Sequence, residues 1–418
     1  MSRSIFSEKA LASLIRVGDS QKFGIDLKTD RTAIIAAASS AAMDGSVDLT
    51  KFSHVQIRGK PCVYYGDYQS TLLLRAISRH IRNRLRVAIP NRDRIVRGVV
   101  ETLMDGTPMF ATRRDITSFY ETIPIADVRD RLIYDTASSA IVRTYLKSFF
   151  NTHCPGESDV GVPRGIGLSA LLAELAMREF DQEIRDIDGV FKYYRFADDI
   201  LVFSICPADE ITDALAEKLP SPMAFNSQKS EEKFYPGKQK EQPPSLKLEY
   251  LGYEFDTVQL ADKRDSRSVR VAISGRKINR IKSRLILSLK DYLTSKDWHL
   301  LRDRVGFLSS NFRVRRHGTE FVRHSPNVFS GIFFNYRMCG QYYYKSGRMF
   351  CMPYDCRELK ALDGFYHSLI KTKLAGTVSA TRLNELKRLS FNKGYELRIR
   401  VRFEPLRVNA IKQAWLNV

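Results

Sequence analysis

Two adjacent aspartates in the middle of an apolar, aromatic run constrain this chain most. Residues 193–203 read Tyr-Tyr-Arg-Phe-Ala-Asp-Asp-Ile-Leu-Val-Phe. Because burying both carboxylates without partners is very costly, the pattern predicts a β-hairpin with Asp198 and Asp199 at its turn. A rigid turn that carries carboxylates suits a hard divalent cation. The alternative is an ordinary surface turn, since Asp favours turns in general.

A third carboxylate lies upstream, in residues 113–123, which read Arg-Arg-Asp-Ile-Thr-Ser-Phe-Tyr-Glu-Thr-Ile. We expect Asp115 to begin a strand-like stretch that continues into two aromatic residues. The interval from Asp115 to Asp198 is long enough for a helix-rich insertion that returns the chain to the same sheet. The two carboxylates would then share two Mg²⁺ ions about 3.5–4 Å apart, which is the arrangement used for in-line phosphoryl displacement.

Six short segments follow one another in a fixed order. They are Ile-Pro-Asn-Arg-Asp-Arg-Ile-Val-Arg (89–97), Asp-Ile-Thr-Ser-Phe-Tyr (115–120), Val-Pro-Arg-Gly-Ile-Gly-Leu-Ser-Ala (162–170), Phe-Ala-Asp-Asp (196–199), Asn-Ser-Gln-Lys-Ser (226–230) and Leu-Gly-Tyr (251–253). In this order they resemble the motifs of the reverse transcriptases, and the resemblance covers about residues 60–260.

The resemblance implies an α+β fold, namely a right-hand polymerase with fingers, palm and thumb, a ferredoxin-like antiparallel palm sheet and a helical thumb. The corresponding regions are an N-terminal extension at residues 1–60, fingers at 61–107, a palm with finger insertions at 108–260, and a helical basic thumb with the C-terminal region at 261–418.

The resemblance also implies which residues carry the chemistry. Asp115, Asp198 and Asp199 are the expected catalytic residues and metal ligands, with Asp199 orienting or supplementing the other two. The carbonyl of Ile116 is the expected backbone ligand. Lys229 would stabilise the leaving pyrophosphate, unless it is simply a solvated lysine.

Other residues are expected around the nucleotide and the primer. Tyr120 would close against the sugar C2′ and favour deoxynucleotides (dNTPs), unless its ring only belongs to the core. Arg84 or Arg86 would hold the triphosphate, since arginine makes bidentate phosphate contacts. Residues 251–253 (Leu251, Gly252 and Tyr253) would form the primer grip.

The second motif departs from the usual reverse transcriptase pattern. Arg164 stands where Gln is usual, Ala170 where Pro is usual, and Glu174 where Asn is usual. We place Arg164 and Gly165 beside the incoming nucleotide, with the Gly165 loop packing under the base pair. The run Pro-Arg-Gly-Ile-Gly-Leu-Ser-Ala-Leu-Leu-Ala-Glu-Leu resembles prokaryotic defence-associated and abortive-infection reverse transcriptases.

This resemblance implies an RNA-directed DNA polymerase that copies a noncoding RNA into DNA during antiviral defence. Within the group we favour the smaller subunit of type 3 defence systems, which pair two reverse transcriptases with a noncoding RNA. The alternatives are a protein-primed or template-independent terminal transferase of the abortive-infection type and an inactive RNA-binding scaffold. A group II intron maturase is a weaker alternative, because no DNA-binding or endonuclease module follows the expected thumb.

The charge of the chain indicates a polyanionic partner, because the formal net charge is +20. The excess is concentrated in residues 75–114, with ten arginines and three acidic residues, and in residues 263–348, with twenty basic and five acidic residues. The expected nucleic-acid contacts are two helix faces, although either is also explained as a solvated face: Arg75, Arg79 and Arg82 in the first region, and Arg276, Lys277, Arg280 and Arg284 in the second.

The remaining features indicate a cytoplasmic protein that does not enter a membrane. The six cysteines form no Cys-x-x-Cys pair, which fits a reducing compartment. No apolar run reaches the length of a membrane span, and the N-terminus lacks the apolar core of a signal peptide. Oligomerisation is compatible with the sequence.

Overall fold

The structure is a computed structural model that describes residues 4–16, 18–57, 59–154, 159–237, 245–259, 266–316 and 327–416. The chain forms two compact units. The first is built mainly from residues 1–91 and 109–234, and the second from residues 92–108, 235–315 and 327–418.

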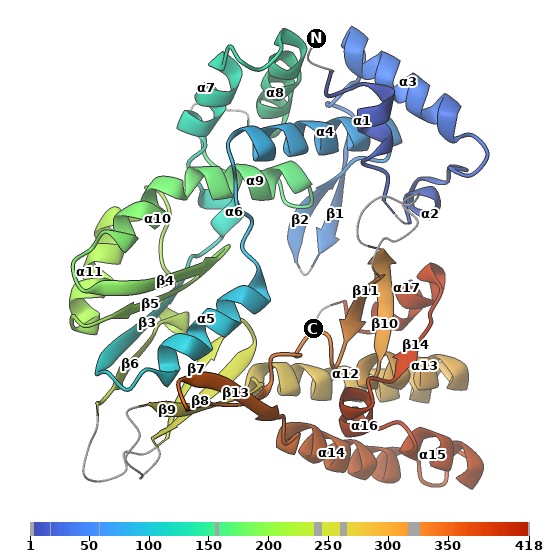
Figure 1. Ribbon diagram of the computed structural model, residues 1–418. Helices are drawn as coiled ribbons and strands as arrows, with labels where there is room; N and C mark the ends of the chain where they lie inside the picture. Colours follow the sequence, from blue (N-terminus) through green and yellow to red (C-terminus); the bar gives the residue numbers. More distant parts are fainter. Residues whose placement is uncertain are drawn as a thin grey trace. The chain divides into compact units, whose positions relative to one another are not determined.

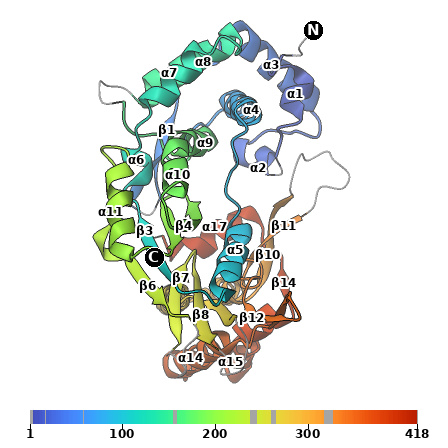
Figure 2. The same ribbon diagram turned by 60° about the vertical axis from the view of Figure 1, so that its left-hand side comes forward.

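Helix α4 (Tyr68–Arg84) is the centre of the helical part of the first unit. The side chain of Asp67 caps its first turn by accepting a 2.6 Å hydrogen bond from the Ser70 amide. The apolar face of α4 is fully buried at Leu73 and Ile77. Helices α1 (Glu8–Ala12), α3 (Arg31–Asp44) and α9 (Gly167–Ala176) surround α4 (Figure 2).

The other elements of this region are helices and one antiparallel strand pair. Helix α10 (Arg178–Arg185) follows α9 directly after Met177. The remaining elements are α2 (Asp19–Phe23), the antiparallel pair β1 (Ser53–Ile57) and β2 (Lys60–Tyr64), α6 (Phe119–Thr122), α7 (Ala126–Tyr134) and α8 (Ala140–His153).

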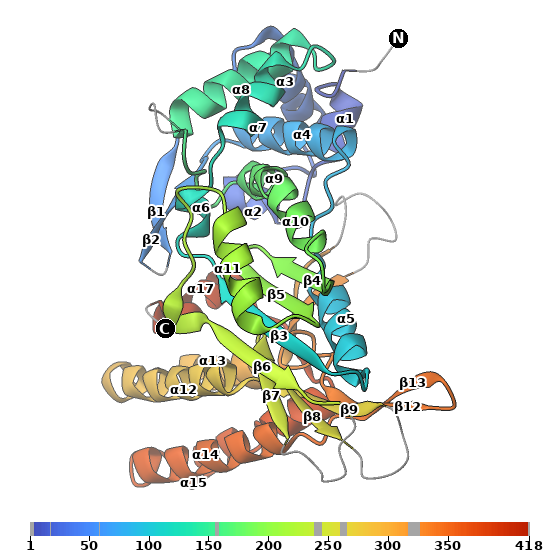
Figure 3. The same ribbon diagram turned by 90° about the vertical axis from the view of Figure 1, so that its left-hand side faces the viewer.

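A four-stranded sheet with the order β4-β5-β3-β6 completes the first unit. Helices α10 and α11 cover one face of it (Figures 1 and 3). Ile200 and Val202 share the core that contains Phe180 and Ile211 of these helices. The elements are β3 (Met109–Asp115), β4 (Val190–Phe196), β5 (Asp199–Ser204), β6 (Glu231–Tyr235), α10 (Arg178–Arg185) and α11 (Ala208–Lys218).

The second unit contains a five-stranded sheet with the order β13-β12-β9-β8-β7, in which neighbouring strands are antiparallel. Helix α5 (Arg92–Met104) packs on strands of this sheet. The strands are β7 (Leu246–Tyr250), β8 (Tyr253–Gln259), β9 (Arg267–Ile273), β12 (Gly340–Lys345) and β13 (Arg348–Pro353).

Six helices and a second small sheet make up the rest of this unit among the described residues. The small sheet has the order β11-β10-β14. The elements are β10 (Asn311–Arg316), β11 (Asn327–Gly331), β14 (Arg400–Val401), α12 (Gly275–Ser295), α13 (Trp298–Ser309), α14 (Arg357–Leu374), α15 (Ala380–Lys387), α16 (Phe391–Glu396) and α17 (Pro405–Gln413).

One expectation for the C-terminal region needs correction. The expected helical character of residues 261–418 is wrong in part, because strands alternate with helices there. Strand β14 has only two residues. Ser274 precedes α12, and its hydroxyl makes no capping hydrogen bond.

Among the described residues, no helix combines the length and the apolar character needed to cross a membrane.

Candidate active site

Asp115 is the last residue of β3, so the expectation that it begins a strand is wrong. Strand β3 is almost wholly buried, and Asp115 itself is 6% exposed. Its backbone is hydrogen-bonded to the segment that precedes η1 (Ser227–Lys229), since the Asp115 carbonyl accepts a 2.7 Å hydrogen bond from the Asn226 amide. A rigid, buried strand therefore ends at this carboxylate.

The predicted acidic hairpin is confirmed, and it lies against the end of β3. Asp199 pairs with Phe196 across the hairpin and with Asp115 across β3. The turn is therefore Ala197-Asp198, and the Ile116 amide donates a 2.8 Å hydrogen bond to the Asp198 carbonyl. These pairings bring all three predicted carboxylates to one edge of the sheet.

The turn has a strained backbone. Ala197 has a φ of 54°, a left-handed conformation that a residue with a Cβ adopts at a cost. Such strain costs on the order of 1–3 kcal/mol and persists only where the surroundings enforce it. Here the Ala197 carbonyl accepts a 3.3 Å hydrogen bond from Arg195. The turn is thus held from the strand that precedes it.

The three carboxylates differ in their electrostatic surroundings. Lys229 Nζ lies 2.7 and 2.9 Å from the two oxygens of Asp115. Arg113 donates to both oxygens of Asp199, at 2.9 and 3.1 Å. Within the described part of the chain, the side chain of Asp198 has no ion pair and no hydrogen bond from another residue.

The pKa of Asp198 is raised, first by burial and then by the negative charge of Asp115, while Lys229 and Arg164 oppose the shift. Burial also raises the pKa of Asp199, and Arg113 opposes that shift. Two carboxylates that repel each other at the end of a rigid strand form a site that a cation would stabilise.

Arg113 is a site residue that the sequence interpretation missed. It lies two positions before Asp115 and therefore projects from the same face of β3. It is 6% exposed, and Glu231 lies 3.9 Å away. The signal for this role was the alternation of side chains along the strand, which places Arg113 on the face of β3 that carries Asp115.

The donor set fits a divalent cation of the magnesium type. Among the described residues no three His, Cys, Asp or Glu side chains are grouped to hold a metal. Mg²⁺ usually needs only one or two carboxylates, because substrate phosphates and water complete its shell. Asp115, Asp198 and the carbonyl of Ile116, which accepts no hydrogen bond from a described residue, provide such oxygens.

Tyr120 and Arg164 lie together. The guanidinium of Arg164 sits 5.1 Å from the ring centroid of Tyr120 and donates to both oxygens of Glu121, at 2.5 and 2.9 Å. The Tyr120 carbonyl accepts a 2.7 Å hydrogen bond from the Val162 amide. Burial raises the pKa of the Tyr120 hydroxyl, and the carboxylate of Glu174 adds to the shift. The second motif is therefore attached directly to the segment that follows Asp115.

Gly165 is required by a close backbone approach. Its φ is 97°, and a Cβ at this position would lie 2.5 Å from the carbonyl oxygen of Val63. The adjacent Arg164 carbonyl accepts a 2.7 Å hydrogen bond from the Val63 amide. Glycine thus allows the loop of the second motif to pack on β2.

The Leu251-Gly252 segment forms the turn between β7 and β8 in the second unit. Leu251 and Gly252 have φ values of 50° and 79°, as a tight hairpin turn demands. Arg92 donates two hydrogen bonds, of 3.0 and 2.6 Å, to the Leu251 carbonyl. Its guanidinium also lies 4.6 Å from the ring centroid of the fully buried Tyr253. Arg92, which the sequence interpretation did not single out, fixes this turn.

The arginines expected to bind nucleic acid have varied surroundings. Arg84 is paired with Asp135 through bonds of 2.7 and 2.9 Å, whereas Arg86 is exposed. The contacts of Arg75 and Arg79 lie within the first unit, and Arg82 is exposed. On α12, the exposure of the four predicted cations ranges from full to partial: Arg276 is exposed, and Lys277, Arg280 and Arg284 are half-buried.

A buried ion network supports the acidic hairpin from behind. Arg195 of β4 is 5% exposed and contacts Glu174 at 2.8 Å and Asp181 at 2.6 Å. Tyr193 donates a further 2.7 Å hydrogen bond to Asp181. Burial raises the pKa of Glu174, and Arg195 opposes this shift. The unusual Glu174 of the second motif is therefore paired with an arginine on the acidic hairpin.

Comparison with known families agrees with this geometry. Residues 68–255 match the family described as reverse transcriptase (RNA-dependent DNA polymerase). This part of the chain is therefore similar to a reverse transcriptase domain. Domains of this family belong to nucleotidyltransferases that act as RNA-directed DNA polymerases, and the match includes the β3 end, the acidic hairpin, Lys229 and the Leu251-Gly252 turn.

Solved structures of telomerase are also similar to the chain. One is apo telomerase from Candida tropicalis truncated from the C-terminal domain, with 12% identity and a TM-score of 0.34, covering 54% of each chain. Another is telomerase from Candida albicans with a fragment of telomeric RNA, with 12% identity and a TM-score of 0.33, covering 82% of this chain and 53% of that one. The chain thus spans about half the length of these telomerase chains. No curated protein matches the chain.

Replacing Arg195 should destabilise the reverse transcriptase domain. Arg195→Gln would leave Glu174 and Asp181 buried without their cation, so we expect the free energy of unfolding to fall by about 3–5 kcal/mol. The measurement is denaturant unfolding at neutral pH. Arg185→Gln is the control, because its exposed guanidinium contributes only a cation–π contact to Tyr193, worth about 1 kcal/mol or less. Equal losses in both variants would contradict the role of the network.

Proposed function

We propose that this chain is an RNA-directed DNA polymerase that adds dNTPs by two-metal phosphoryl transfer. The observation that carries the proposal is that the β3–β5 register and the bond from the Ile116 amide to the Asp198 carbonyl bring Asp198 beside Asp115 at the end of β3. The two carboxylates repel each other, and Asp198 has no cationic partner among the described residues. The reverse transcriptase domain provides the reaction class, and the carboxylate pair provides the reason for a divalent cation.

In this proposal the β4-β5-β3-β6 sheet is the palm, and the fingers, palm and thumb have the boundaries that the sequence predicts. Asp115, Asp198 and the Ile116 carbonyl would hold Mg²⁺, which when bound activates the attacking 3′-hydroxyl and neutralises charge on the pyrophosphate. Asp199, held by Arg113, orients the hairpin and supplements the site.

Lys229 has a separate role in the proposed reaction. Its side chain is 43% exposed although its ammonium contacts the nearly buried Asp115. This contact holds the Lys229 ammonium at the rim of the site. A positive charge there stabilises the negative charge that develops on the departing pyrophosphate.

The biological setting rests on the sequence motifs. We propose that the template is a noncoding RNA, that the product is DNA and that the protein acts in antiviral defence, as the run from Pro163 to Leu175 suggests. A second reverse transcriptase subunit is part of this proposal. All six cysteines are free thiols, which supports the proposed location in the reducing cytoplasm.

The substitution Asp198→Asn should abolish primer extension while leaving RNA binding intact. Because metal-held charge stabilisation is worth several kcal/mol, we expect at least about a 100-fold loss of dNTP incorporation on a primed RNA template. Asp188→Asn, a change outside the site, is the control. Retained extension would reject the assignment, and incorporation by the parent without template would instead indicate a terminal transferase.

The same variant should change the pH dependence of stability. Folding raises the pKa of Asp198, so its contribution is most favourable at low pH and is lost as the pH rises through the folded-state pKa. Asp198→Asn lacks this loss, and its melting temperature should therefore exceed that of the parent at pH 8 by more than at pH 4. An equal difference at both pH values would show that Asp198 is not destabilised by its surroundings.

The substitution Tyr120→Ala should weaken discrimination against ribonucleotides. A half-buried ring fixed by Arg164 is proposed to exclude the 2′-hydroxyl, and removing a steric contact of this size changes selectivity by roughly 10- to 100-fold. The measurement is the ratio of kcat/KM for a dNTP and the matching ribonucleotide. Tyr120→Phe, which keeps the ring, should retain the parent ratio. If Tyr120→Ala discriminates as well as the parent, the steric assignment fails.

A further inference from the structure

Glu121 is a carboxylate of the first unit that the proposed reaction does not use, although it directly follows Tyr120 in the chain. Both residues belong to the short helix α6, just after the strand that ends at Asp115. The Arg164 guanidinium donates to both oxygens of Glu121, at 2.5 and 2.9 Å, and lies 5.1 Å from the ring centroid of Tyr120. One arginine of the second motif therefore joins two consecutive residues of α6.

The contact between Arg164 and Glu121 fixes the orientation of the guanidinium. Its Nε and Nη2 atoms donate to different oxygens of the carboxylate, in the two-pronged geometry that arginine favours. A guanidinium within about 6 Å of a tyrosine ring is attracted by the π electrons of that ring. The position of the Tyr120 ring therefore depends, through Arg164, on the Glu121 carboxylate.

The charges of the pair reinforce this contact. Hydrogen bonding to Arg164 lowers the pKa of Glu121, while burial acts in the opposite direction. The same hydrogen bonding raises the pKa of Arg164. Lys60 of β2 adds a second cation, 4.0 Å from a Glu121 oxygen. Glu121 is therefore ionised at neutral pH and neutralises the charge that Arg164 brings to the second motif.

The backbone around Arg164 is held by other contacts. Its carbonyl accepts a 2.7 Å hydrogen bond from the Val63 amide, and the Val162 amide donates one of 2.7 Å to the Tyr120 carbonyl. These bonds do not involve the Glu121 side chain. Removing that side chain should therefore free the Arg164 guanidinium and leave the loop of the second motif in place.

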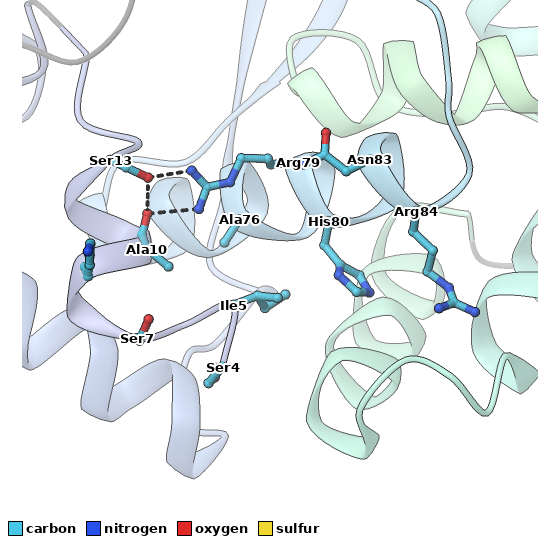
Figure 4. Close-up of a pocket in the computed structure, with 11 residues that line it drawn as sticks. Ser4, Ile5, Ser7, Ala10, Ser13, Ala76, Arg79, His80, Asn83 and Arg84 are labelled. Atoms are coloured by element: carbon cyan, nitrogen blue, oxygen red, sulfur yellow. Dashed lines mark hydrogen bonds between the residues drawn. The ribbon is translucent and has the colours of Figure 1, made fainter. Parts of the chain in front are cut away.

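Arg79 of α4 shows that neutral oxygens can also hold an arginine in this unit. Its guanidinium turns toward the N-terminal segment and donates to the Ser13 hydroxyl and to the Ala10 carbonyl, at 2.5 and 3.1 Å (Figure 4). Glu121→Gln would keep one neutral oxygen for Arg164, whereas Glu121→Ala would keep none. The two substitutions therefore separate the loss of charge from the loss of the contact.

We propose that Glu121 is a positioning residue for the selection of deoxynucleotides, because it holds the Arg164 guanidinium against the ring of Tyr120. The ring is thereby kept where it excludes a 2′-hydroxyl. The inference rests on the proposed function and on the steric role proposed for Tyr120. Arg164, which replaces the usual Gln, then holds the ring and is not free to bind a substrate phosphate.

The experiment uses the full chain and measures the ratio of kcat/KM for a dNTP and the matching ribonucleotide on a primed RNA template. Glu121→Ala should lower this ratio about two- to fivefold, which is the effect of losing a partly exposed cation–π contact. Glu121→Gln should give a ratio between those of the parent and Glu121→Ala. Asp130→Ala is the control, because it removes the same charge from a pair with Arg129 in α7 and should keep the parent ratio.

Two combined variants test whether Glu121 acts through Arg164 and Tyr120. Glu121→Ala with Arg164→Gln should lower the ratio no further than Arg164→Gln alone, because both changes remove one shared contact. In a Tyr120→Ala background, Glu121→Ala should leave the ratio unchanged. Losses that multiply in either combination, or an unchanged ratio in Glu121→Ala itself, would overturn the inference.

Incorporation by the parent and by Tyr120→Ala separates this inference from the proposed function. If the parent incorporates dNTPs and Tyr120→Ala lowers the ratio but Glu121→Ala does not, the role of Glu121 alone is rejected. If the parent incorporates no dNTP on the primed template, the proposed polymerase function fails, and the role of Glu121 fails with it.

Discussion

The repulsion between Asp115 and Asp198 is the constraint on which the rest of the site depends. Two carboxylates do not settle side by side in a partly buried place unless the backbone leaves them no choice. Here β3 ends at Asp115, and the register of β5 places the hairpin turn beside it. The turn is then locked by the Ile116 amide and by Arg195. The sheet thus keeps an unfavourable arrangement of charge that a divalent cation would make favourable.

The surrounding cations divide the three carboxylates into different tasks. Arg113 is almost fully buried and holds Asp199 with two hydrogen bonds, which suits a structural anchor. Lys229 reaches Asp115 from an exposed position, which suits a group that can turn toward a substrate. Asp198 alone of the three lacks a cationic partner among the described residues. The arrangement therefore points to Asp198, together with Asp115, as the metal-binding pair.

Much of this geometry follows from local pattern. The apolar, aromatic run around Asp198-Asp199 predicted the hairpin, because a turn at the two aspartates keeps their carboxylates out of the core. The position of Asp115 in its strand was predicted wrongly. Asp115 ends β3, and the aromatic residues after it belong to the short helix α6. Arg113 was missed although side-chain alternation places it on the same face of β3 as Asp115. Arg195 was missed because helix packing brings Glu174 and Asp181 to it, which residue spacing does not show. The strands of the C-terminal region were missed because pairings between distant segments, such as β12 with β9, are not visible in the local sequence.

Metal binding in the absence of turnover tests most directly whether Asp198 is a metal ligand. Titration with Mn²⁺ in place of Mg²⁺, followed by electron paramagnetic resonance in the presence of a dNTP, reports the site without requiring catalysis. If Asp198 is a ligand, Asp198→Asn should weaken Mn²⁺ binding by on the order of tenfold or more. Asp199→Asn should have a much smaller effect, because Arg113 already donates hydrogen bonds to the Asp199 carboxylate. Unchanged Mn²⁺ affinity in Asp198→Asn, or an equal loss in Asp199→Asn, would contradict the account.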